Sequence, residues 1–282
     1  MSTAINAADV MRLRNMTDRP MMECKKALTE AGGDFQKAMD ELRKRNANIA
    51  AGKADREAAE GRVFIHVTPD HSKAAIVELR CESAPVTKAD GFIKLGNELA
   101  EWLVKAAKVP SSVDEFNAAS FDGKRTVKDR IEELIGLIRE NMKIARFAVL
   151  TGGPFGQYIH HDGTVGTLLQ LKGATTNVND ALLKEVGMHI TASQTKYALR
   201  GDIPAEVLAK EREIAEAQAK ATGKPEKVIQ MIVEGKVKTW TSENVLVEQK
   251  FVKDDSKTIA DVLAPTKLEV VSFKRFKVGE LS

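Results

Sequence analysis

The chain has 282 residues, 43% of them hydrophobic and 29% charged, which is enough for one sizeable core and a smaller domain. Its formal net charge is only +3, so the large basic excess of a dedicated nucleic-acid binder is absent and a protein partner is favoured. Two cysteines, Cys24 and Cys81, form no CxxC pair, which disfavours a disulfide framework or a zinc site. Without a signal-peptide pattern or a run of 18 apolar residues, the sequence predicts a cytoplasmic protein with no membrane contact.

The N-terminal block, residues 1–46, predicts a bundle of three short helices. In the third helix, apolar side chains fall at i, i+3, i+4 and i+7 from Phe35 onward, which is one face of a helix. The pair Gly32-Gly33 is expected to end the second helix, and Asp34 is expected to cap the third. Residues 47–60 are small and charged without a sustained apolar stripe, so they predict a linker that tolerates some helix.

The rest of the chain alternates between strand-like and helix-like periods. Strands are expected at about 62–67, 74–79, 145–150, 157–160, 164–171 and 268–273. Helices are expected at about 87–108, 124–140, 178–193 and 258–263. This order predicts an α+β fold with antiparallel sheets, divided into a core N-subdomain at 61–150 and a core C-subdomain at 151–282. The two subdomains look related.

Residues 204–240 predict a helical hairpin inserted in the second subdomain. Gly223 can end its first helix, and Pro225 can start its second. The second helix carries five apolar residues within 228–233, an arc too wide for an isolated hairpin in water. Two interpretations remain open: the arc packs against its own domain, or it forms a homodimer.

Motifs for covalent chemistry are missing from the sequence. It contains no GxxxxGK[ST] phosphate loop, no HExxH and no GxSxG. Of the five histidines only His160 and His161 are neighbours, and we expect no carboxylate cluster at ligand spacing around them. The glycine-rich stretch 152–156 fits a turn between strands better than a nucleotide cradle. The sequence therefore favours a binding module over an enzyme, with no metal and no cofactor.

One long ungapped stretch resembles a known family. Residues 21–34, which read MMECKKALTEAGGD, look like the signature of elongation factor Ts. Further similarities follow in the same order along the chain, at 187–193, 223–236, 251–258 and 273–280. The resemblance therefore covers nearly the whole chain.

The resemblance implies a nucleotide-exchange function without covalent chemistry. Members of the family bind the translation GTPase elongation factor Tu, hold its nucleotide-free form, and let GDP leave so that GTP can enter. A ligand that prefers the empty GTPase must weaken nucleotide binding by the same factor, which is thermodynamic linkage. The resemblance also implies a ubiquitin-associated-like fold for the three N-terminal helices, followed by a core of two related subdomains with the inserted helical hairpin.

Five positions match residues with which the family contacts the GTPase. Lys25 matches a helix lysine that touches the GTPase domain, with a solvated surface lysine as the alternative interpretation. Ile138 and Arg139 match a contact pair at a helix end, with arginine where a glycine is familiar. Val252 and Lys253 match a late contact segment.

Two histidine positions carry different expectations. The strands at 157–160 and 164–171 are expected to form a hairpin around His161-Asp162-Gly163. His160, two residues after Tyr158, matches a histidine of this hairpin that reaches the partner, and His161 is the alternative if the hairpin register shifts by one. His189 falls on a helix face with Val186 and Ile190 nearby, so we favour a satisfied core histidine over an interface residue.

The main departure from the family lies at the end of the second core strand. Members usually carry Cys-x-Thr-Asp-Phe-Val there, whose aspartate and phenylalanine form a wedge: the ring inserts between GTPase helices and disturbs the bound magnesium. Here the stretch reads CESAPV, so Ala84 stands in place of the aspartate and Pro85 in place of the phenylalanine. Losing an interface anchor commonly costs about 2 kcal/mol or more. We expect Ser83 to cap the helix that follows.

Three explanations for this departure stay open. In order of preference, the partner GTPase carries compensating changes, exchange relies on other contacts such as His160, or the chain binds and stabilises its partner with weak exchange. A basic face that binds RNA is a hypothesis of a different class, which the near-balanced charge disfavours. Some family members continue past the final strand into a C-terminal helical module, so we expect a lower affinity here than in those longer members.

Overall fold

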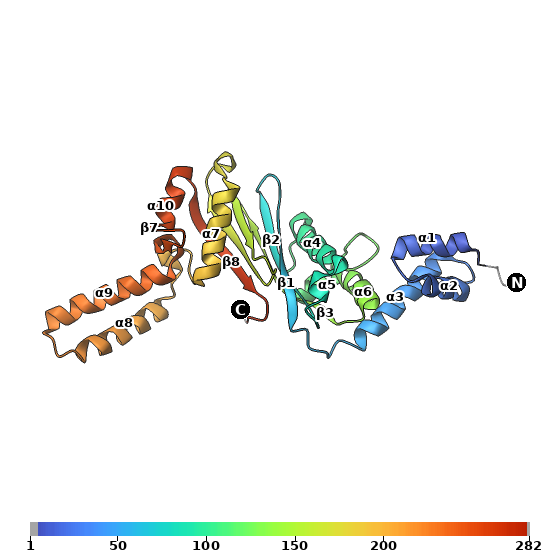
Figure 1. Ribbon diagram of the computed structural model, residues 1–282, viewed down its shortest axis with the longest axis horizontal. Helices are drawn as coiled ribbons and strands as arrows, with labels where there is room; N and C mark the ends of the chain where they lie inside the picture. Colours follow the sequence, from blue (N-terminus) through green and yellow to red (C-terminus); the bar gives the residue numbers. More distant parts are fainter. Residues whose placement is uncertain (1–4, 281–282) are drawn as a thin grey trace. The chain divides into compact units, whose positions relative to one another are not determined.

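Strands and helices follow one another much as the sequence pattern predicts, in an α+β fold with small sheets and three N-terminal helices (Figure 1). The computed structural model describes residues 5–280. Residues 1–4, part of the N-terminal stretch that lacks a signal-peptide pattern, and residues 281–282 lie outside the described range. Among the described residues, no helix is both long and apolar enough to cross a membrane.

The chain divides into two compact units. The first comprises Met1–Arg62, Glu78–Trp102 and Ala106–Arg146, and the second comprises Val63–Val77, Leu103–Lys105 and Phe147–Ser282. The domain boundaries expected from the sequence differ from this division and stay a prediction.

The first unit begins with the expected bundle of helices α1 (Ala7–Thr17), α2 (Met21–Glu30) and α3 (Phe35–Ala51). Asp34 caps α3 as expected, because its side chain accepts a hydrogen bond from the Lys37 backbone N–H at 3.1 Å. Apolar side chains from all three helices form one small core: Val10, Leu13, Cys24, Ala27, Leu28, Ala38 and Leu42.

Helix α3 is longer than the sequence pattern indicates, and its second half packs along α6 (Val127–Ile138). The helix continues to Ala51, into the segment expected to be a linker, and both Asn46 and Ala50 are buried. The guanidinium group of Arg19, only 3% exposed, donates hydrogen bonds to the Asn46 side-chain oxygen and, at 2.9 Å, to the backbone oxygen of Gly136. This buried arginine therefore holds the bundle against α6.

Two further helices and part of a sheet complete the first unit. Strands β1 (Glu60–Val67), β2 (Lys73–Cys81) and β3 (Met142–Thr151) form a sheet in that order. Helix α4 (Asp90–Lys105) was expected, but the short α5 (Val113–Ala118) was not. Six residues are too few for a helical period to show. The helix forms because Ser112 caps it and because buried Phe116 packs against Trp102, with 5.2 Å between ring centroids.

The second unit contains a second sheet and the helices around it. Strands β4 (Phe155–Ile159), β5 (Val165–Lys172) and β8 (Glu269–Lys277) pair antiparallel, in the order β4-β5-β8. Helix α7 (Asp180–Ser193) packs on β4 and β5, next to the short α10 (Ile259–Leu263) in the same core. The small hairpin of β6 (Lys250–Phe251) and β7 (Asp254–Thr258) was not expected, because the β7 sequence DDSKT shows no apolar alternation.

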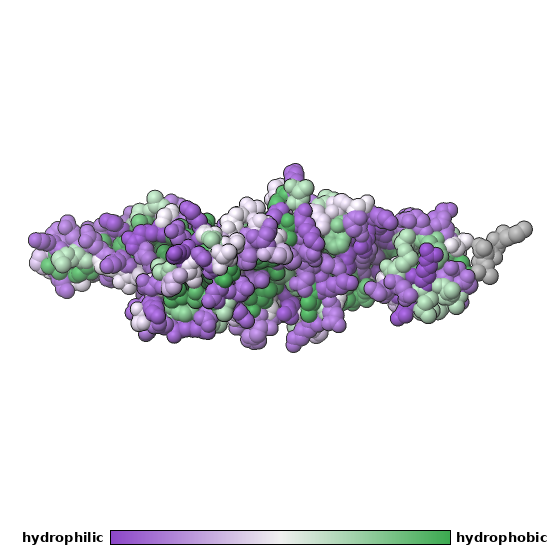
Figure 2. All heavy atoms as spheres, turned by 90° about the horizontal axis from the view of Figure 1, so that it is seen from above, coloured by the Kyte–Doolittle hydropathy of each residue, from purple (hydrophilic) through white to green (hydrophobic). Residues whose placement is uncertain are grey.

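The helical hairpin consists of α8 (Ala205–Lys220) and α9 (Glu226–Asn244). Gly223 has a positive φ of 66° where α8 ends, as expected for a glycine stop. The two helices bury Ala215, Ala219, Ile229 and Val233 against each other. Met231 remains 67% exposed, and Figure 2 shows apolar patches among hydrophilic surroundings on this hairpin. The helices thus cover part of the apolar arc themselves, and the homodimer stays a prediction.

We predict opposite effects for alanine at two helix-interior glycines. A Cβ at Gly136 would collide with the Arg19 guanidinium and the Asn46 side-chain oxygen, whereas a Cβ at Gly235 in α9 meets nothing within 4 Å. Gly136→Ala should therefore displace buried hydrogen bonds and lower the free energy of unfolding by about 1–3 kcal/mol. Gly235→Ala should raise it by ~0.5–1 kcal/mol through helix propensity alone.

Chemical denaturation of the two variants, followed by circular dichroism, measures both effects. Gly235→Ala is the matched control, since the residue change and helical context are the same. Equal stabilisation by both substitutions would mean that Arg19 does not hold α3 against α6.

Candidate partner-binding site

The outer face of α2 presents Lys25 to solvent. Its neighbour Cys24 points into the core of the bundle and is fully buried. Met22, almost one turn earlier in the helix, is 72% exposed. A cationic side chain beside an exposed, adaptable methionine suits a protein partner. The specific contact of Lys25 with a GTPase stays a prediction.

Arg139 follows the last residue of α6 in a backbone conformation that favours glycine. Its φ of 67° and ψ of 24° are left-handed, and its backbone N–H donates to the Ile135 oxygen at 2.8 Å to close the last helical turn. A non-glycine residue in this conformation costs roughly 1 kcal/mol, so a glycine would be the unstrained residue at this position. The Arg139 side chain, 51% exposed, donates to the Glu23 carboxylate at 3.1 Å. Ile138 beside it is half-buried.

The turn after β2 offers no aromatic side chain. Ala84 and Pro85 are both exposed and lead into a 3-10 helix, Val86–Lys88. The expectation that Ser83 caps this helix is wrong. Its hydroxyl and its backbone N–H instead donate to the Glu140 carboxylate, at 2.6 Å and 3.0 Å. An ionised carboxylate is the stronger acceptor, so this pairing prevails over a local cap.

Hydrogen bonds at the end of α6 bring together three of the expected contact segments. Arg139 connects to α2 through Glu23, and the next residue, Glu140, connects to the turn after β2 through Ser83. We call these four residues, Glu23, Arg139, Glu140 and Ser83, the α6-end relay. Sequence reasoning missed Glu23 and Glu140, which lie 116 and 57 positions from their partners.

Cys81, at the end of β2, is an inert thiol. It is fully buried, and its sulfur lies 3.4 Å from the Ser83 backbone oxygen. Burial, together with the nearby Glu140 carboxylate, raises the pKa of the Cys81 thiol to about 12. Nucleophilic thiol chemistry at neutral pH is therefore disfavoured at this turn.

His160 directly follows β4, at the entrance to the β4–β5 turn. Tyr158 pairs with Thr167 and Ile159 with Gly166, and the His160 backbone N–H donates to the Val165 oxygen at 2.8 Å. This register places His160 half-buried, while His161 is exposed in the turn itself. The Tyr158 hydroxyl lies 3.0 Å from His160 Nδ1 and orients the ring. The β4–β5 register is therefore regular at His160, without the one-residue shift that would favour His161. The contact of His160 with a partner stays a prediction.

We expected no carboxylate cluster around these histidines, and the structure places one carboxylate, that of Asp162, at ligand spacing beside them. His160, His161 and Asp162 each offer one ligand atom, and these atoms all lie within 4.8 Å of one another. The turn brings the next residue in sequence, Asp162, back toward both rings. The run His-His-Asp in the sequence is the signal that could have found this cluster.

Val252 and Lys253 form the connection between β6 and β7, and α7 holds them in place. The Val252 backbone N–H donates to His189 Nδ1 at 3.3 Å, and Lys253 pairs with Glu185 at 2.8 Å. His189 is 1% exposed, and its Nε2 lies 2.9 Å from the Gln249 side-chain oxygen. The expectation of a satisfied core histidine is confirmed. Since Nδ1 accepts from Val252, Nε2 carries the proton and donates to Gln249.

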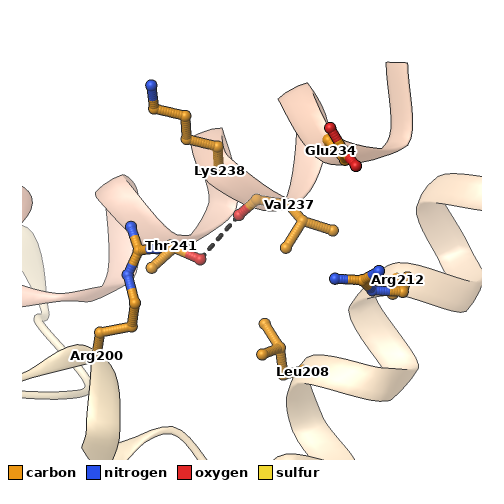
Figure 3. Close-up of a pocket in the computed structure, with 7 residues that line it drawn as sticks. All are labelled: Arg200, Leu208, Arg212, Glu234, Val237, Lys238 and Thr241. Atoms are coloured by element: carbon orange, nitrogen blue, oxygen red, sulfur yellow. Dashed lines mark hydrogen bonds between the residues drawn. The ribbon is translucent and has the colours of Figure 1, made fainter. Parts of the chain in front are cut away.

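An open cleft at the base of the helical hairpin was not expected from the sequence (Figure 3). It has a volume of about 270 Å³, and Leu208 of α8 and Val237 of α9 face each other across it. Charged residues surround them: Arg200, Arg212, Glu234 and Lys238. Cofactor pockets are usually more enclosed and range from roughly 300 to 1,000 Å³, so this cleft better suits the side chains of a protein partner.

Comparison with known proteins places the chain in a family. A family model described as Elongation factor TS matches residues 82–280. Elongation factor Ts of Thiobacillus denitrificans is 42% identical over 277 residues, which cover 98% of this chain and 92% of the relative. The proteins of the same name from Methylococcus capsulatus and Thermobifida fusca are 40% and 39% identical, covering 98% and 97% of this chain and 93% and 98% of the relatives.

The chain belongs to the elongation factor Ts family. Membership of this family supports a role in protein biosynthesis, as a nucleotide-exchange factor for elongation factor Tu. As in other members of the elongation factor Ts family, we treat the exposed and half-buried side chains of this subsection as candidates for binding a partner.

The buried His189 should make stability sensitive to acid. Burial lowers the pKa of His189, so the unfolded chain takes up a proton first as the pH falls below about 6.5. The contribution of neutral, buried His189 to the free energy of unfolding is therefore complete above that pH. It is lost as the pH falls, by up to about 1.4 kcal/mol per pH unit. We predict that His189→Gln is less stable than wild type at pH 7.5 but loses less stability between pH 7.5 and pH 5.5.

Urea denaturation at the two pH values measures this difference. His66→Gln, in β1, is a matched control that should keep the wild-type loss. An identical loss in His189→Gln and wild type would mean that His189 is not the acid-sensitive group.

Proposed function

We propose that this chain binds elongation factor Tu carrying GDP, promotes the release of GDP, and stabilises the nucleotide-free GTPase until GTP enters. The α6-end relay is the observation that carries this proposal. It holds α2, the end of α6 and the turn after β2 in one hydrogen-bonded arrangement, so that a partner meets a surface already in its binding conformation.

The proposed contacts come from both units of the chain. They comprise Lys25, Ser83, Ala84, Pro85, Ile138, Arg139, His160, Val252 and Lys253. Most of these side chains are exposed or half-buried, and neither Ala84 nor Pro85 makes a side-chain hydrogen bond that would need to break. Ser83 contributes in a different way, by fixing the turn through Glu140. Ala84 and Pro85 have short side chains, and hydrogen bonds already orient those of Ser83, Arg139 and His160, so these positions lose little conformational entropy on binding.

Exchange by such a surface needs no proton transfer. If the chain binds the empty GTPase more tightly than the GDP-bound form, GDP must bind the complex more weakly by the same factor. A factor of a thousand corresponds to about 4 kcal/mol of differential binding. That energy comes from contacts made fully only when the nucleotide has left.

The turn after β2 favours exchange through contacts other than a wedge. Ala84 carries no charge and Pro85 presents a small ring, so neither fills a slot shaped for an aromatic anchor. Of the two explanations for exchange without a wedge, we rank compensating changes in the partner first and reliance on His160 and the α6-end relay second. The same observation favours one second candidate function, in which the chain binds and stabilises elongation factor Tu while exchanging its nucleotide only weakly.

Release of a fluorescent GDP analogue from the cognate elongation factor Tu tests the proposal. We expect the chain to accelerate release strongly at substoichiometric concentration. Binding to the GTPase without acceleration would overturn exchange and leave the stabilising role. Absence of binding would overturn both.

We predict that Lys25 and its neighbour Lys26 behave differently in this assay. Both are exposed on α2, but only Lys25 matches a contact position, and Lys26 lies 3.9 Å from Glu30 within the same helix. Lys25→Ala should reduce kcat/KM for exchange about 5-fold, equivalent to ~1 kcal/mol of lost interface contact. Lys26→Ala is the control and should change it less than 2-fold. Equal effects would assign both lysines to general electrostatic attraction.

We also predict that restoring the familiar wedge will not help with the native partner. The double variant Ala84→Asp, Pro85→Phe places an aspartate and an aromatic ring on an exposed turn, so it should fold normally. If the partner has compensating changes, the exchange rate should stay the same or fall. A large gain in rate would show that the partner still has an open slot and would contradict compensation.

A further inference from the structure

The β4–β5 turn gathers two imidazoles and one carboxylate on three consecutive residues. His160, His161 and Asp162 each contribute one donor atom to a group within 4.8 Å, and the two rings lie 4.3 Å apart between centroids. Hydrogen bonds from the His160 N–H to Val165 and from the Gly163 N–H to His160, each 2.8 Å, close the turn. The backbone therefore holds the three side chains on one short, fixed loop.

Other residues already orient two of the three donor groups. The Tyr158 hydroxyl lies 3.0 Å from His160 Nδ1, which leaves Nε2 of that ring available. One oxygen of Asp162 accepts hydrogen bonds from the Thr164 backbone N–H and hydroxyl, both at 2.8 Å, which leaves the other oxygen available. Metal-binding histidines and carboxylates in proteins are oriented by partners of this kind.

We propose that His160, His161 and Asp162 form a binding site for a divalent transition metal ion, and that Zn²⁺ is its ligand. Two nitrogen donors and one carboxylate oxygen suit zinc, with bonds of about 2.0–2.2 Å. Around a tetrahedral ion such donors lie roughly 3.4 Å apart, so small rotations of the three side chains, of which His161 and Asp162 are exposed, bring them into place. Three protein ligands leave one coordination position for water or for a donor from another molecule.

The site has a consequence that rests on the proposed function. His160 is one of the residues proposed to contact elongation factor Tu, and a bound Zn²⁺ would occupy the Nε2 atom that faces away from Tyr158. Zinc and the partner would then compete for one side chain. Binding of zinc to the isolated chain does not depend on this competition, so the two proposals can fail separately.

Competition with a chromophoric zinc chelator tests the site on the full chain, with Zn²⁺ alone as the probe. We expect one zinc ion per chain with a dissociation constant in the micromolar range, on the order of −8 kcal/mol. His161→Ala and Asp162→Asn should each weaken this binding at least tenfold. Both residues are exposed, and an asparagine keeps the side-chain oxygen that accepts from Thr164, so both variants should fold.

His66→Ala is the matched control, because this half-buried histidine on β1 is not part of the cluster. It should bind zinc as wild type does. The proposal is overturned if wild type shows no saturable binding below about 100 μM, equivalent to roughly −5.5 kcal/mol. It is also overturned if His161→Ala and Asp162→Asn bind zinc as tightly as His66→Ala, which would assign the binding to scattered surface groups.

Discussion

The hydrogen bonds that charged side chains make at the C-terminal end of α6 are the constraint on which the first unit depends. Arg19 of the helical bundle donates to the backbone oxygen of Gly136 in α6. Three residues after Gly136, Arg139 donates to the carboxylate of Glu23 in the bundle. Glu140 then fixes Ser83 in the turn after β2. Charge-assisted hydrogen bonds are strong and directional, and Arg19 is buried while Ser83 and Glu140 are half-buried, so α2, α6 and the turn are held together.

Sequence patterns predicted the elements of this fold well, because a helical or strand period is a local property. The three N-terminal helices, strands β1 and β2 and helix α7 all follow from apolar spacing. The extension of α3 was underestimated, because its second half is buried by α6 and not by an apolar stripe of its own. Helix α5 and the β6–β7 hairpin were missed, because each is too short or too polar for a period to appear.

The arrangement around the site was less predictable, because its partners are distant in sequence. Ser83 was expected to serve the helix that follows it, but a carboxylate 57 positions away takes both of its donors. His189 could be assigned to the core from its helix face, while its bond to the Val252 backbone required the β6–β7 hairpin. In both units, therefore, a buried or half-buried side chain hydrogen-bonds to the backbone of a segment that carries exposed contact candidates.

The most direct test of this account is a double-mutant cycle on Ser83 and Glu140, read out as affinity for nucleotide-free elongation factor Tu. If the α6-end relay orders the binding surface, Ser83→Ala and Glu140→Ala should each weaken binding. The two changes together should cost no more than Glu140→Ala alone, a coupling energy on the order of 1 kcal/mol. Additive effects, or single variants that bind as tightly as wild type, would contradict a surface organised by this relay.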